Sequence, residues 1–557
     1  MIRNLGAIAD NTYDLAVIGG GIYGACIAWE AVLRGLSVAL FEKGDFCGAT
    51  SANSLKIIHG GFRYLQNADI QRMRESIRER RTLMSIAPHL VHPLRVLIPN
   101  YGHSTRGREA FQAAVLLNEL ISADRNRLDD PQKKIPAGKT VSKQECIRML
   151  PGLPQKDLSG GTIFYDAQVY NSERLVLAFL FSAKRRGAQV MNYTEVVNFL
   201  REGERIIGVE VEDVLSHQRA TIHARIVINA AGPWIGSVLD LLGMNRPPHR
   251  FKLAKAVNVV TRQLFEGYAV GLPGENGYRE EWVAAQRSKS FLFVAPWRNR
   301  SLIGTIYSAV GDNPDQDITA RREMAYLLRE VNHAYPPAKL REDEVVLVHS
   351  GLLPMSGTKN ESGEVLLKKH YRILDHRKEG LLGLITVEGV KYTTARDVAK
   401  AVIDQVFTIW GHRPPPSTSA DIPLDSGQID RFSDFLQVET AKQPYKLGIE
   451  QMRNLVYNYG SLYKAVLSYF DSGYAEGRSL PVDLALIQAQ VQHAVQEEMA
   501  VKLADVIFRR TDLGSAGQPD EQTVAFCAEV MGAELNWDQY RVSQELAEVN
   551  RAFQVGN

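Results

Sequence analysis

Three short segments of contrasting pattern follow one another near the beginning of the chain. An apolar run covers Tyr13–Ile18, the stretch Ile22–Arg34 is compatible with a helix, and a second apolar run, Ser37–Phe41, ends just before Glu42. Short apolar runs on either side of a helical segment are typical of a β-α-β unit. We therefore predict that Tyr13–Glu42 forms such a unit.

Further apolar runs recur along the chain and are separated by helical stretches and clusters of turn residues. This mixed spacing has no internal repeat, and it favours an α/β fold with a mixed sheet. The strand-like runs are Arg225–Asn229, Phe291–Val294, Ser301–Thr305 and Leu381–Thr386.

The last quarter of the chain has a different pattern. The run His412–Ser417 holds three successive prolines, which cannot continue a helix, and predicts a stiff linker. Beyond it, Glu521–Val530 is helical in pattern. Helical spacing is also shown by Val495, Met499, Leu503 and Val506. We expect a small, mainly helical domain from about residue 425 to 557.

Composition narrows the class of protein. The chain has 557 residues, of which 45% are hydrophobic, enough for a large core and about three domains. Its 65 Lys and Arg balance 63 Asp and Glu, so we expect no nucleic-acid partner. We find neither a signal peptide nor a spanning segment, and expect a cytoplasmic protein, either free or peripheral on the inner face of a membrane.

The four cysteines do not form a recognisable metal or disulfide pattern. They are widely spaced and include no CxxC pair, so no zinc or iron–sulfur site is predicted. Cys47 lies in a loop that should be near a cofactor. A buried structural thiol and a reactive or flavin-linked thiol both remain open for Cys47.

The candidate chemistry begins with a glycine-rich turn. Gly19, Gly21 and Gly24 supply GxGxxG directly after the first strand, and Glu42 ends the second strand. Gly19 permits a tight turn, Gly21 lets a pyrophosphate approach the helix N-terminus, and Gly24 permits close packing. Glu42 can accept hydrogen bonds from both ribose hydroxyls. Because we find no second GxGxxG, one dinucleotide that meets the substrate directly fits best, and FAD and NAD both remain open at this point.

The segment after Glu42 resembles a known family. The run 49–65 reads ATSANSLKIIHGGFRYL and is similar to TSxxSSKLIHGGLRYL of the aerobic, FAD-dependent glycerol-3-phosphate dehydrogenases. Similar blocks occur at Asn229–Trp234, Gly389–Thr394 and Glu497–Gly514. The resemblance implies FAD as the cofactor and the branch of the flavoprotein fold that includes D-amino-acid oxidase.

The resemblance also implies a division into domains. A Rossmann-type FAD-binding domain and an α+β substrate or cap domain would share residues 13–410, and a C-terminal helical domain would follow. The FAD-binding pieces would be about 13–65, 165–250 and 340–410. The cap pieces would be about 66–164 and 251–339.

Residue roles follow from the matched blocks. His59 is a candidate proton acceptor, Arg63 would hold the phosphate of the substrate, and Lys391 would stabilise the negative charge of the reduced flavin. A histidine satisfied by backbone groups remains an equal alternative for His59. The cofactor-binding residues implied are Gly19, Gly21, Gly24, Glu42, Lys43, Thr50, Ser51, Ser54, His59, Gly60, Val196, Ala230, Gly232, Gly389, Lys391 and Thr393.

Three departures from the family pattern touch the substrate side. Where the family has KGxH, this chain has Asn258 in place of the histidine. Leu353 stands in place of the arginine of SGxRPL, and Tyr307 stands in place of the aspartate of GTTD. A possible base, an arginine and a carboxylate are thereby replaced, whereas the cofactor blocks remain. An anionic substrate would lose about 2 to 5 kcal/mol of pairing without the arginine. A less charged, larger or more apolar substrate is therefore expected.

Three functional hypotheses follow. The leading one is an FAD-dependent dehydrogenase or oxidase that moves hydride from a hydroxyl-bearing carbon of glycerol 3-phosphate, or of a related substrate, to flavin N5. The second is an FAD-dependent oxidase of an amine or amino acid, and the third is a non-catalytic FAD-binding protein. Quinone and oxygen are both open as the electron acceptor, and the oligomeric state cannot be predicted.

Overall fold

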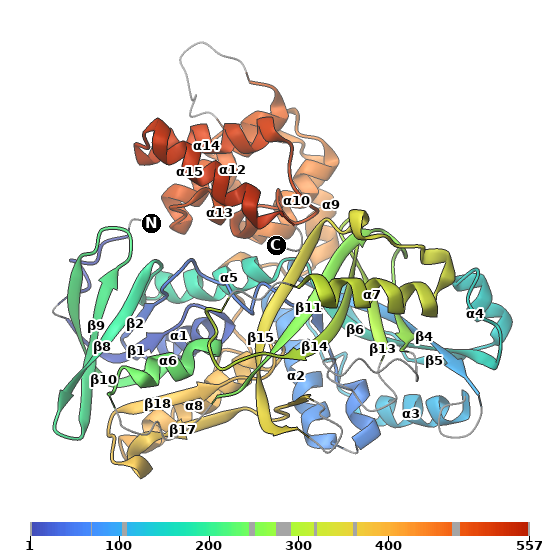
Figure 1. Ribbon diagram of the computed structural model, residues 1–557, viewed down its shortest axis with the longest axis horizontal. Coiled ribbons are helices and arrows are strands. Elements are labelled where there is room, and N and C mark those ends of the chain that lie inside the picture. Colours follow the sequence, from blue (N-terminus) through green and yellow to red (C-terminus); the bar gives the residue numbers. More distant parts are fainter. Residues whose placement is uncertain are drawn as a thin grey trace.

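The computed structural model describes residues 3–9, 11–67, 69–102, 108–243, 251–274, 291–316, 320–359, 365–470 and 480–554. Two sheets lie next to each other, and a helical domain at the C-terminal end of the chain, orange to red in Figure 1, lies across them. None of the described helices is both long enough and apolar enough to cross a bilayer.

The first sheet, here called the parallel sheet, contains the predicted β-α-β unit. Its central strands run parallel in the order β7-β2-β1-β10-β18, while β17 and the β8–β9 hairpin add antiparallel edges. The strands are β1 (Thr12–Ile18), β2 (Val38–Phe41), β7 (Gln189–Met191), β8 (Thr194–Glu202), β9 (Arg205–Asp213), β10 (Arg219–Asn229), β17 (Arg372–Asp375) and β18 (Leu384–Glu388).

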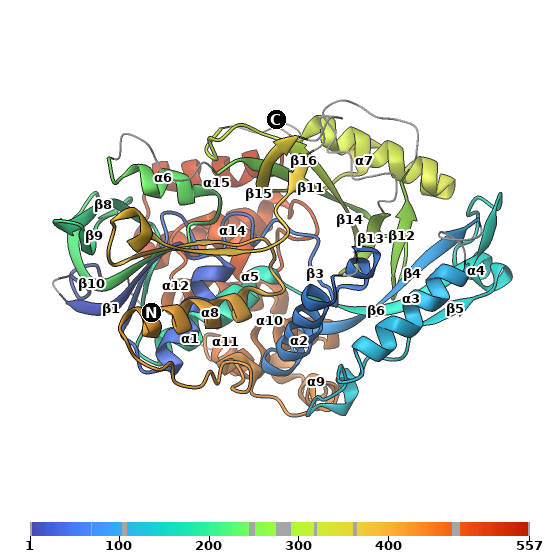
Figure 2. The ribbon, with the colours of Figure 1, turned by 90° about the horizontal axis from the view of Figure 1, so that it is seen from below.

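Helices cover both faces of the parallel sheet. On one face α1 packs between its neighbours α5 and α8, which Figure 2 shows side by side below the sheet. Because α1 is contacted on several sides, it is apolar nearly all round, and small residues such as Ala25 and Ala28 allow the close approach. The helices are α1 (Ile22–Leu33), α5 (Ser172–Arg185) and α8 (Ala395–Ile409) on this face, and α6 (Ile235–Asp240) on the other.

The second sheet, here called the larger sheet, is mostly antiparallel. Its order is β16-β15-β11-β14-β13-β12-β4-β6-β3, with β5 beside β6. The strands are β3 (Ile57–Ile58), β4 (Val91–Tyr101), β5 (Lys139–Val141), β6 (Leu158–Val169), β11 (Leu253–Arg262), β12 (Ala269–Pro273), β13 (Phe291–Trp297), β14 (Arg300–Ala309), β15 (Leu347–Lys359) and β16 (Val365–Leu367).

The two faces of the larger sheet carry different side chains because successive residues of a strand point to opposite faces. In β4, Leu97 packs into the core beneath α7, whereas Val96 and Ile98 belong to a separate aromatic cluster on the other face. The helices around this sheet are α2 (Ile70–Ile86), α3 (Arg108–Ile121), α4 (Lys143–Met149) and α7 (Arg321–Ala334).

The helical domain has two cores of its own. One lies among α9, α10, α11 and the beginning of α12, and the other among α12, α14 and α15. The helices are α9 (Phe432–Ala441), α10 (Ile449–Tyr459), α11 (Tyr463–Leu467), α12 (Val482–Glu498), α13 (Leu503–Asp505), α14 (Glu521–Leu535) and α15 (Gln539–Ala552).

Most predicted elements are present. The fold class is confirmed, and the strand predicted at Leu381–Thr386 begins later, at Leu384, because Gly383 has a positive φ of 82°. Continuous helical spacing through Met499 is wrong, since Met499 is left-handed (φ 54°) and ends α12. The predicted division at 340 also differs from the strand pairing, because β15 and β16 belong to the larger sheet.

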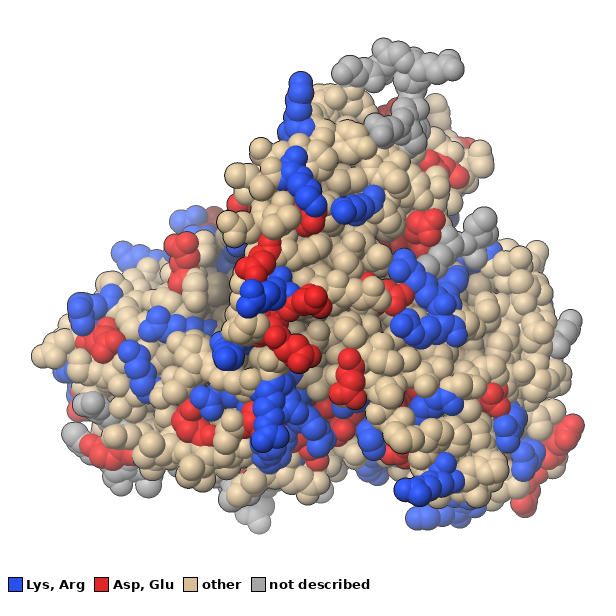
Figure 3. Space-filling view, turned by 180° about the vertical axis from the view of Figure 1, so that it is seen from behind, with Lys and Arg blue, Asp and Glu red and all other residues tan. Residues whose placement is uncertain are grey.

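The surface carries charges of both signs. In the view of Figure 3, Lys and Arg side chains are interspersed with Asp and Glu side chains, and neither sign covers a whole face. This distribution agrees with the near balance of charges in the sequence.

Candidate active site

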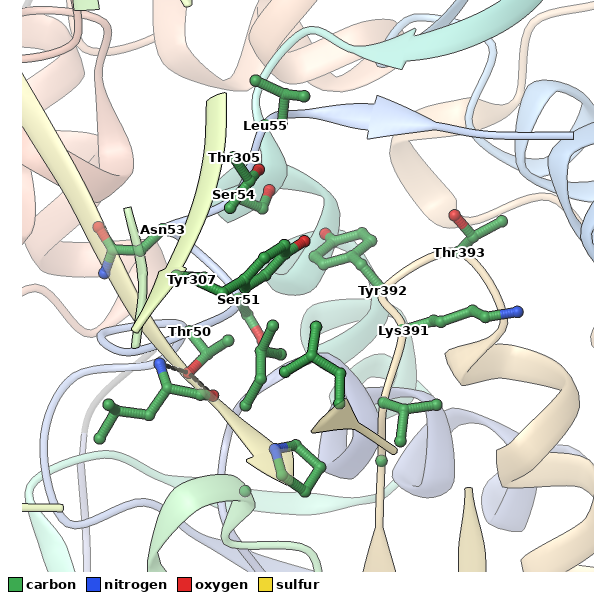
Figure 4. Close-up of a pocket in the computed structure, with 18 of the residues that line it drawn as sticks. Thr50, Ser51, Asn53, Ser54, Leu55, Thr305, Tyr307, Lys391, Tyr392 and Thr393 are labelled. Carbon is green, nitrogen blue, oxygen red and sulfur yellow. Dashed lines mark hydrogen bonds between the residues drawn. The ribbon is translucent and has the colours of Figure 1, made fainter. Parts of the chain in front are cut away.

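A cavity of 2980 Å³ runs between the parallel sheet and the larger sheet, and it is here called the pocket. Its wall includes the glycine turn after β1, the loop 47–55, the segment 387–393 before α8 and one face of the larger sheet. Figure 4 shows how residues from distant parts of the sequence meet there, with Thr50 and Ser51 on one wall and Tyr307 and Tyr392 on others.

Two positions of the glycine turn, Gly19 and Gly24, leave no room for a larger residue. Gly19 has φ 108°, and a Cβ on Gly24 would lie 1.9 Å from the Gly19 carbonyl oxygen. Gly21 precedes the first turn of α1 without a side-chain cap, and it lines the pocket. The positive end of α1 therefore faces the pocket with room for an anion such as a pyrophosphate.

Glu42, directly after β2, holds the glycine turn in place. Its Oε2 accepts a hydrogen bond from the Gly20 backbone N at 2.7 Å, and its Oε1 accepts one from Gly44 N at 2.9 Å. Burial raises the pKa of Glu42 although both hydrogen bonds oppose this shift. Lys43, also on the wall, lies over the Trp234 ring at 4.4 Å and pairs with Asp315 at 3.3 Å.

The loop of small and hydroxylated residues joins the two sheets. Ser51 Oγ accepts a hydrogen bond from Ile22 N at 3.0 Å, at the start of α1. Thr50 Oγ1 donates to the Leu352 carbonyl at 2.9 Å and accepts from Leu352 N at 3.1 Å, so it ties the loop to β15. Cys47 is buried, and burial raises the pKa of its thiol well above the usual value, which argues against a reactive thiolate.

The segment before α8 is shaped by a tyrosine that the sequence analysis missed. The Tyr23 hydroxyl donates to the Lys391 carbonyl at 2.7 Å and accepts from the backbone N of Val390 and of Lys391, each at 3.1 Å. A Cβ on Gly389 would lie 2.2 Å from the Tyr23 ring, so glycine is required there. A tyrosine between Gly21 and Gly24 gives no signal of this distant contact.

An ion pair beneath the pocket holds the turn that carries His59. Arg80 and Asp166 pair at 2.8 Å, and Asp166 also accepts a hydrogen bond from Gly60 N. A Cβ on Gly60 would lie 2.3 Å from the Arg80 guanidinium. Gly60 thus packs closely against Arg80, and its partner Asp166 lies on the pocket wall. His59 itself lies on the wall.

Tyr64 connects the polar residues at this end of the pocket. Its ring lies edge-on to His59 with centroids 5.7 Å apart, 4.3 Å below Lys391 Nζ and 4.4 Å from the Arg72 guanidinium. Burial, and then the charge of Arg72, lower the pKa of Lys391 to about 8. Arg63 lies one residue before Tyr64, in the short helix Phe62–Asn67, but its side chain is outside the described part of the structure.

The three residues that differ from the family pattern lie together on one face of the larger sheet. Asn258, Tyr307 and Leu353 all line the pocket, from β11, β14 and β15 respectively. The Asn258 amide oxygen accepts a hydrogen bond from the Thr305 hydroxyl at 2.6 Å. An amide held in this way cannot serve as a proton acceptor.

Known proteins share this architecture. A model described as FAD dependent oxidoreductase matches residues 14–387, and one described as the C-terminal domain of alpha-glycerophosphate oxidase matches residues 419–542. The chain belongs to the FAD-dependent oxidoreductase family.

Relatives within this family agree on the overall arrangement. The chain is 33% identical to a Synechocystis glycerol-3-phosphate dehydrogenase over 92% of this chain and 90% of that protein. It is 29% identical to a Mycobacterium leprae protein of the same name, over 97% of this chain and 87% of the relative. A solved glycerol-3-phosphate dehydrogenase from Bacillus halodurans, complexed with FAD, superposes with a TM-score of 0.77 at 25% identity, over 99% of this chain and 96% of that one.

This FAD-dependent oxidoreductase has the glycerol-3-phosphate dehydrogenase arrangement, and FAD is its cofactor. The glycine cradle at Gly19 and Gly21 and the exposed end of α1 fit the dinucleotide. Of the residues predicted to bind cofactor, the pocket wall includes Gly19, Gly21, Glu42, Lys43, Thr50, Ser51, Ser54, His59, Val196, Ala230, Gly232, Gly389, Lys391 and Thr393. Tyr23, Tyr64 and Arg72 are wall residues that the sequence analysis did not identify.

Proposed function

We propose that this protein oxidises a hydroxyl-bearing carbon of glycerol 3-phosphate or of a related substrate. The observation that carries the proposal is the grouping of His59, Lys391 and Arg72 around the Tyr64 ring, on the wall of the pocket that also holds the glycine turn. Cationic and proton-accepting side chains around one point of a cofactor pocket are what this oxidation requires.

Each residue has a separate task in the proposed reaction. When bound, FAD supplies the hydride acceptor. His59 accepts the proton of the substrate hydroxyl, and the Arg80–Asp166 pair positions His59 through the neighbouring Gly60. Lys391 supplies positive charge at the same end of the pocket, and Arg63 contributes to anion binding.

The cofactor would be held by three parts of the chain. The glycine turn and α1 would bind the pyrophosphate, Glu42 would accept hydrogen bonds from the ribose, and Thr50, Ser51 and Ser54 would line the path to the flavin. Gly389 and Thr393 would bring the N-terminus of α8 near the pyrimidine ring. Quinone or oxygen would take the electrons, and a cytoplasmic location, free or peripheral on a membrane, fits these acceptors.

An anaerobic absorbance screen tests the proposal. The purified flavoprotein is mixed with polyol phosphates, hydroxy acids and amines, and loss of the visible flavin absorbance is recorded. Bleaching by hydroxylated compounds supports the proposal. Bleaching by amines alone would select C–N oxidation, and bleaching by none of these compounds would favour a non-catalytic flavoprotein.

A further inference from the structure

The part of the larger sheet that runs from β6 to β13 brings a cluster of apolar side chains to the pocket, beside the Asp166 carboxylate. Reading from β6 to β13, the pocket is lined by Phe164, by Val96 and Ile98 of β4, and by Phe291 and Phe293. These residues belong to one cluster, in which Phe291 and Phe293 are only partly buried. Apolar surface therefore faces the pocket directly.

Aromatic rings from outside the sheet complete this surface. Phe62, two residues before Tyr64, stacks on Phe164 with centroids 4.5 Å apart, and Phe111 of α3 lies edge-on to Phe291 at 6.4 Å. Both rings line the pocket. We call the set Val96, Ile98, Phe62, Phe111, Phe164, Phe291 and Phe293 the apolar chamber.

Two pocket residues on the neighbouring part of the same face make contacts within the protein. Asn258 accepts the Thr305 hydroxyl, and Tyr307 packs against the pair Ala254 and Met355. Leu353 occupies the place where the resemblance implied an arginine. Figure 4 shows Tyr307 and Tyr392 directing their rings toward the same part of the pocket. This part of the wall favours an apolar or aromatic group over a phosphate.

Cationic side chains lie on the pocket wall around Tyr64, in the same short helix as Phe62. Lys391 Nζ has no carboxylate within 4 Å among the residues that the structure describes, and Arg72 pairs with Asp69 only at 3.4 Å. An ammonium group without a close counter-ion at a pocket wall can pair with an anionic ligand. A substrate that contacts both the apolar chamber and Lys391 would carry an apolar body and an anionic group.

We infer that the substrate is a hydroxylated anion with an aromatic or branched aliphatic body, of the class of substituted 2-hydroxy acids. Its carboxylate pairs with Lys391, its hydroxyl faces His59 and its body lies in the apolar chamber. This inference rests on the proposed function. The C–H bond of the hydroxyl-bearing carbon breaks with hydride transfer to FAD, the hydroxyl proton goes to His59, and the product is the 2-oxo acid.

Anaerobic flavin reduction distinguishes the outcomes. The probes are 3-phenyllactate and 2-hydroxyisocaproate in both enantiomers, lactate as the match without an apolar body, and glycerol 3-phosphate. We expect kcat/KM for one of the first two to exceed that for lactate by about tenfold to a hundredfold, the gain from burying one apolar side chain. Faster reduction by glycerol 3-phosphate or lactate would overturn this inference and leave alcohol oxidation standing. Reduction by no hydroxylated compound would overturn both.

Variants show whether the apolar chamber causes the preference for substrates with an apolar body. Phe293→Ser is expected to lower kcat/KM for 3-phenyllactate at least tenfold more than it lowers kcat/KM for lactate. Phe293→Leu keeps the core filled and should lower kcat/KM for 3-phenyllactate by a smaller factor. Leu353→Arg should lower kcat/KM for the apolar substrates and raise kcat/KM for glycerol 3-phosphate. Leu120→Arg, the same change on the 76% exposed Leu120, is the matched control and should alter neither. Equal losses for lactate and 3-phenyllactate in Phe293→Leu, at unchanged FAD content, would contradict the assignment.

Discussion

Replacement of Asp45 by asparagine tests how the helical domain holds the cofactor loop. Asp45 lies between Glu42 and Cys47, and its carboxylate accepts hydrogen bonds from Arg510 at 2.7 and 2.8 Å and from Arg509 at 2.5 Å. Burial alone would raise the pKa of Asp45, but Arg510 and Arg509 hold it well below its usual range. The ion pair therefore joins a segment after α13 to the loop beside the glycine turn.

The magnitude follows from the burial of this pair. Asp45 is 5% exposed and Arg510 is fully buried, and removal of one partner of such a pair costs about 3 to 5 kcal/mol. Asparagine has nearly the same size but no charge, and it presents an NH2 group to a guanidinium. If loss of the ion pair lets the loop around Asp45 open, a smaller fraction of the protein can bind FAD. The FAD affinity then decreases by about tenfold to a hundredfold.

The assay is titration of the apoprotein with FAD, followed by flavin fluorescence, together with urea denaturation of the holoprotein. Asp343→Asn is the matched control, because the Arg341–Asp343 pair is exposed (71% and 68%) and such a surface pair contributes little to stability. If Asp45→Asn binds FAD as tightly as Asp343→Asn, the helical domain does not stabilise the loop through this pair.

Three further predictions concern single residues. Gly24→Ala should abolish FAD binding, because the added Cβ would lie 1.9 Å from the Gly19 carbonyl oxygen. The control Gly236→Ala, whose added Cβ has its nearest neighbour at 3.5 Å, should bind FAD normally. Retention of FAD during gel filtration measures the difference, and equal retention by both variants would contradict the prediction. Burial and Arg72 lower the pKa of Lys391 to about 8, so its charge is lost above that pH and kcat/KM for an anionic substrate should fall there. Lys391→Arg should remove this fall, and an unchanged pH profile in the variant would refute the role. Burial lowers the pKa of Lys133 to about 7 in the folded state, whereas lysine in the unfolded chain has a pKa of about 10.4. Between these two pH values the unfolded chain binds more protons than the folded chain. The free energy of unfolding should therefore rise with pH from about 7 to about 10.4. Lys133→Met should flatten the rise in urea titrations; equal slopes in both proteins would show that Lys133 is not responsible.

The glycine turn could be predicted from the sequence because its parts are local. The strand, turn and helix that carry Gly19, Gly21 and Gly24 follow one another directly. A Cβ on Gly24 would clash with the Gly19 carbonyl, and a Cβ on Gly19 would clash with the backbone of Ala230, just after β10. Such requirements leave a recognisable spacing.

The rest of the site depends on contacts between distant segments. Tyr23 meets Lys391 across 368 positions, and Arg509 meets Asp45 across 464. The apolar chamber could not be predicted either, because its residues lie in runs that pattern alone assigns to a core. Only the strand order of the larger sheet shows that this face borders the pocket.

The most direct test of the account is anaerobic flavin reduction by a hydroxylated substrate carrying deuterium at the hydroxyl-bearing carbon. In a single turnover the account predicts loss of the visible flavin absorbance, formation of one carbonyl product per flavin and slower reduction with deuterium than with hydrogen. Reduction at equal rates for both isotopes, or no reduction by any hydroxylated compound while an amine bleaches the flavin, would contradict it.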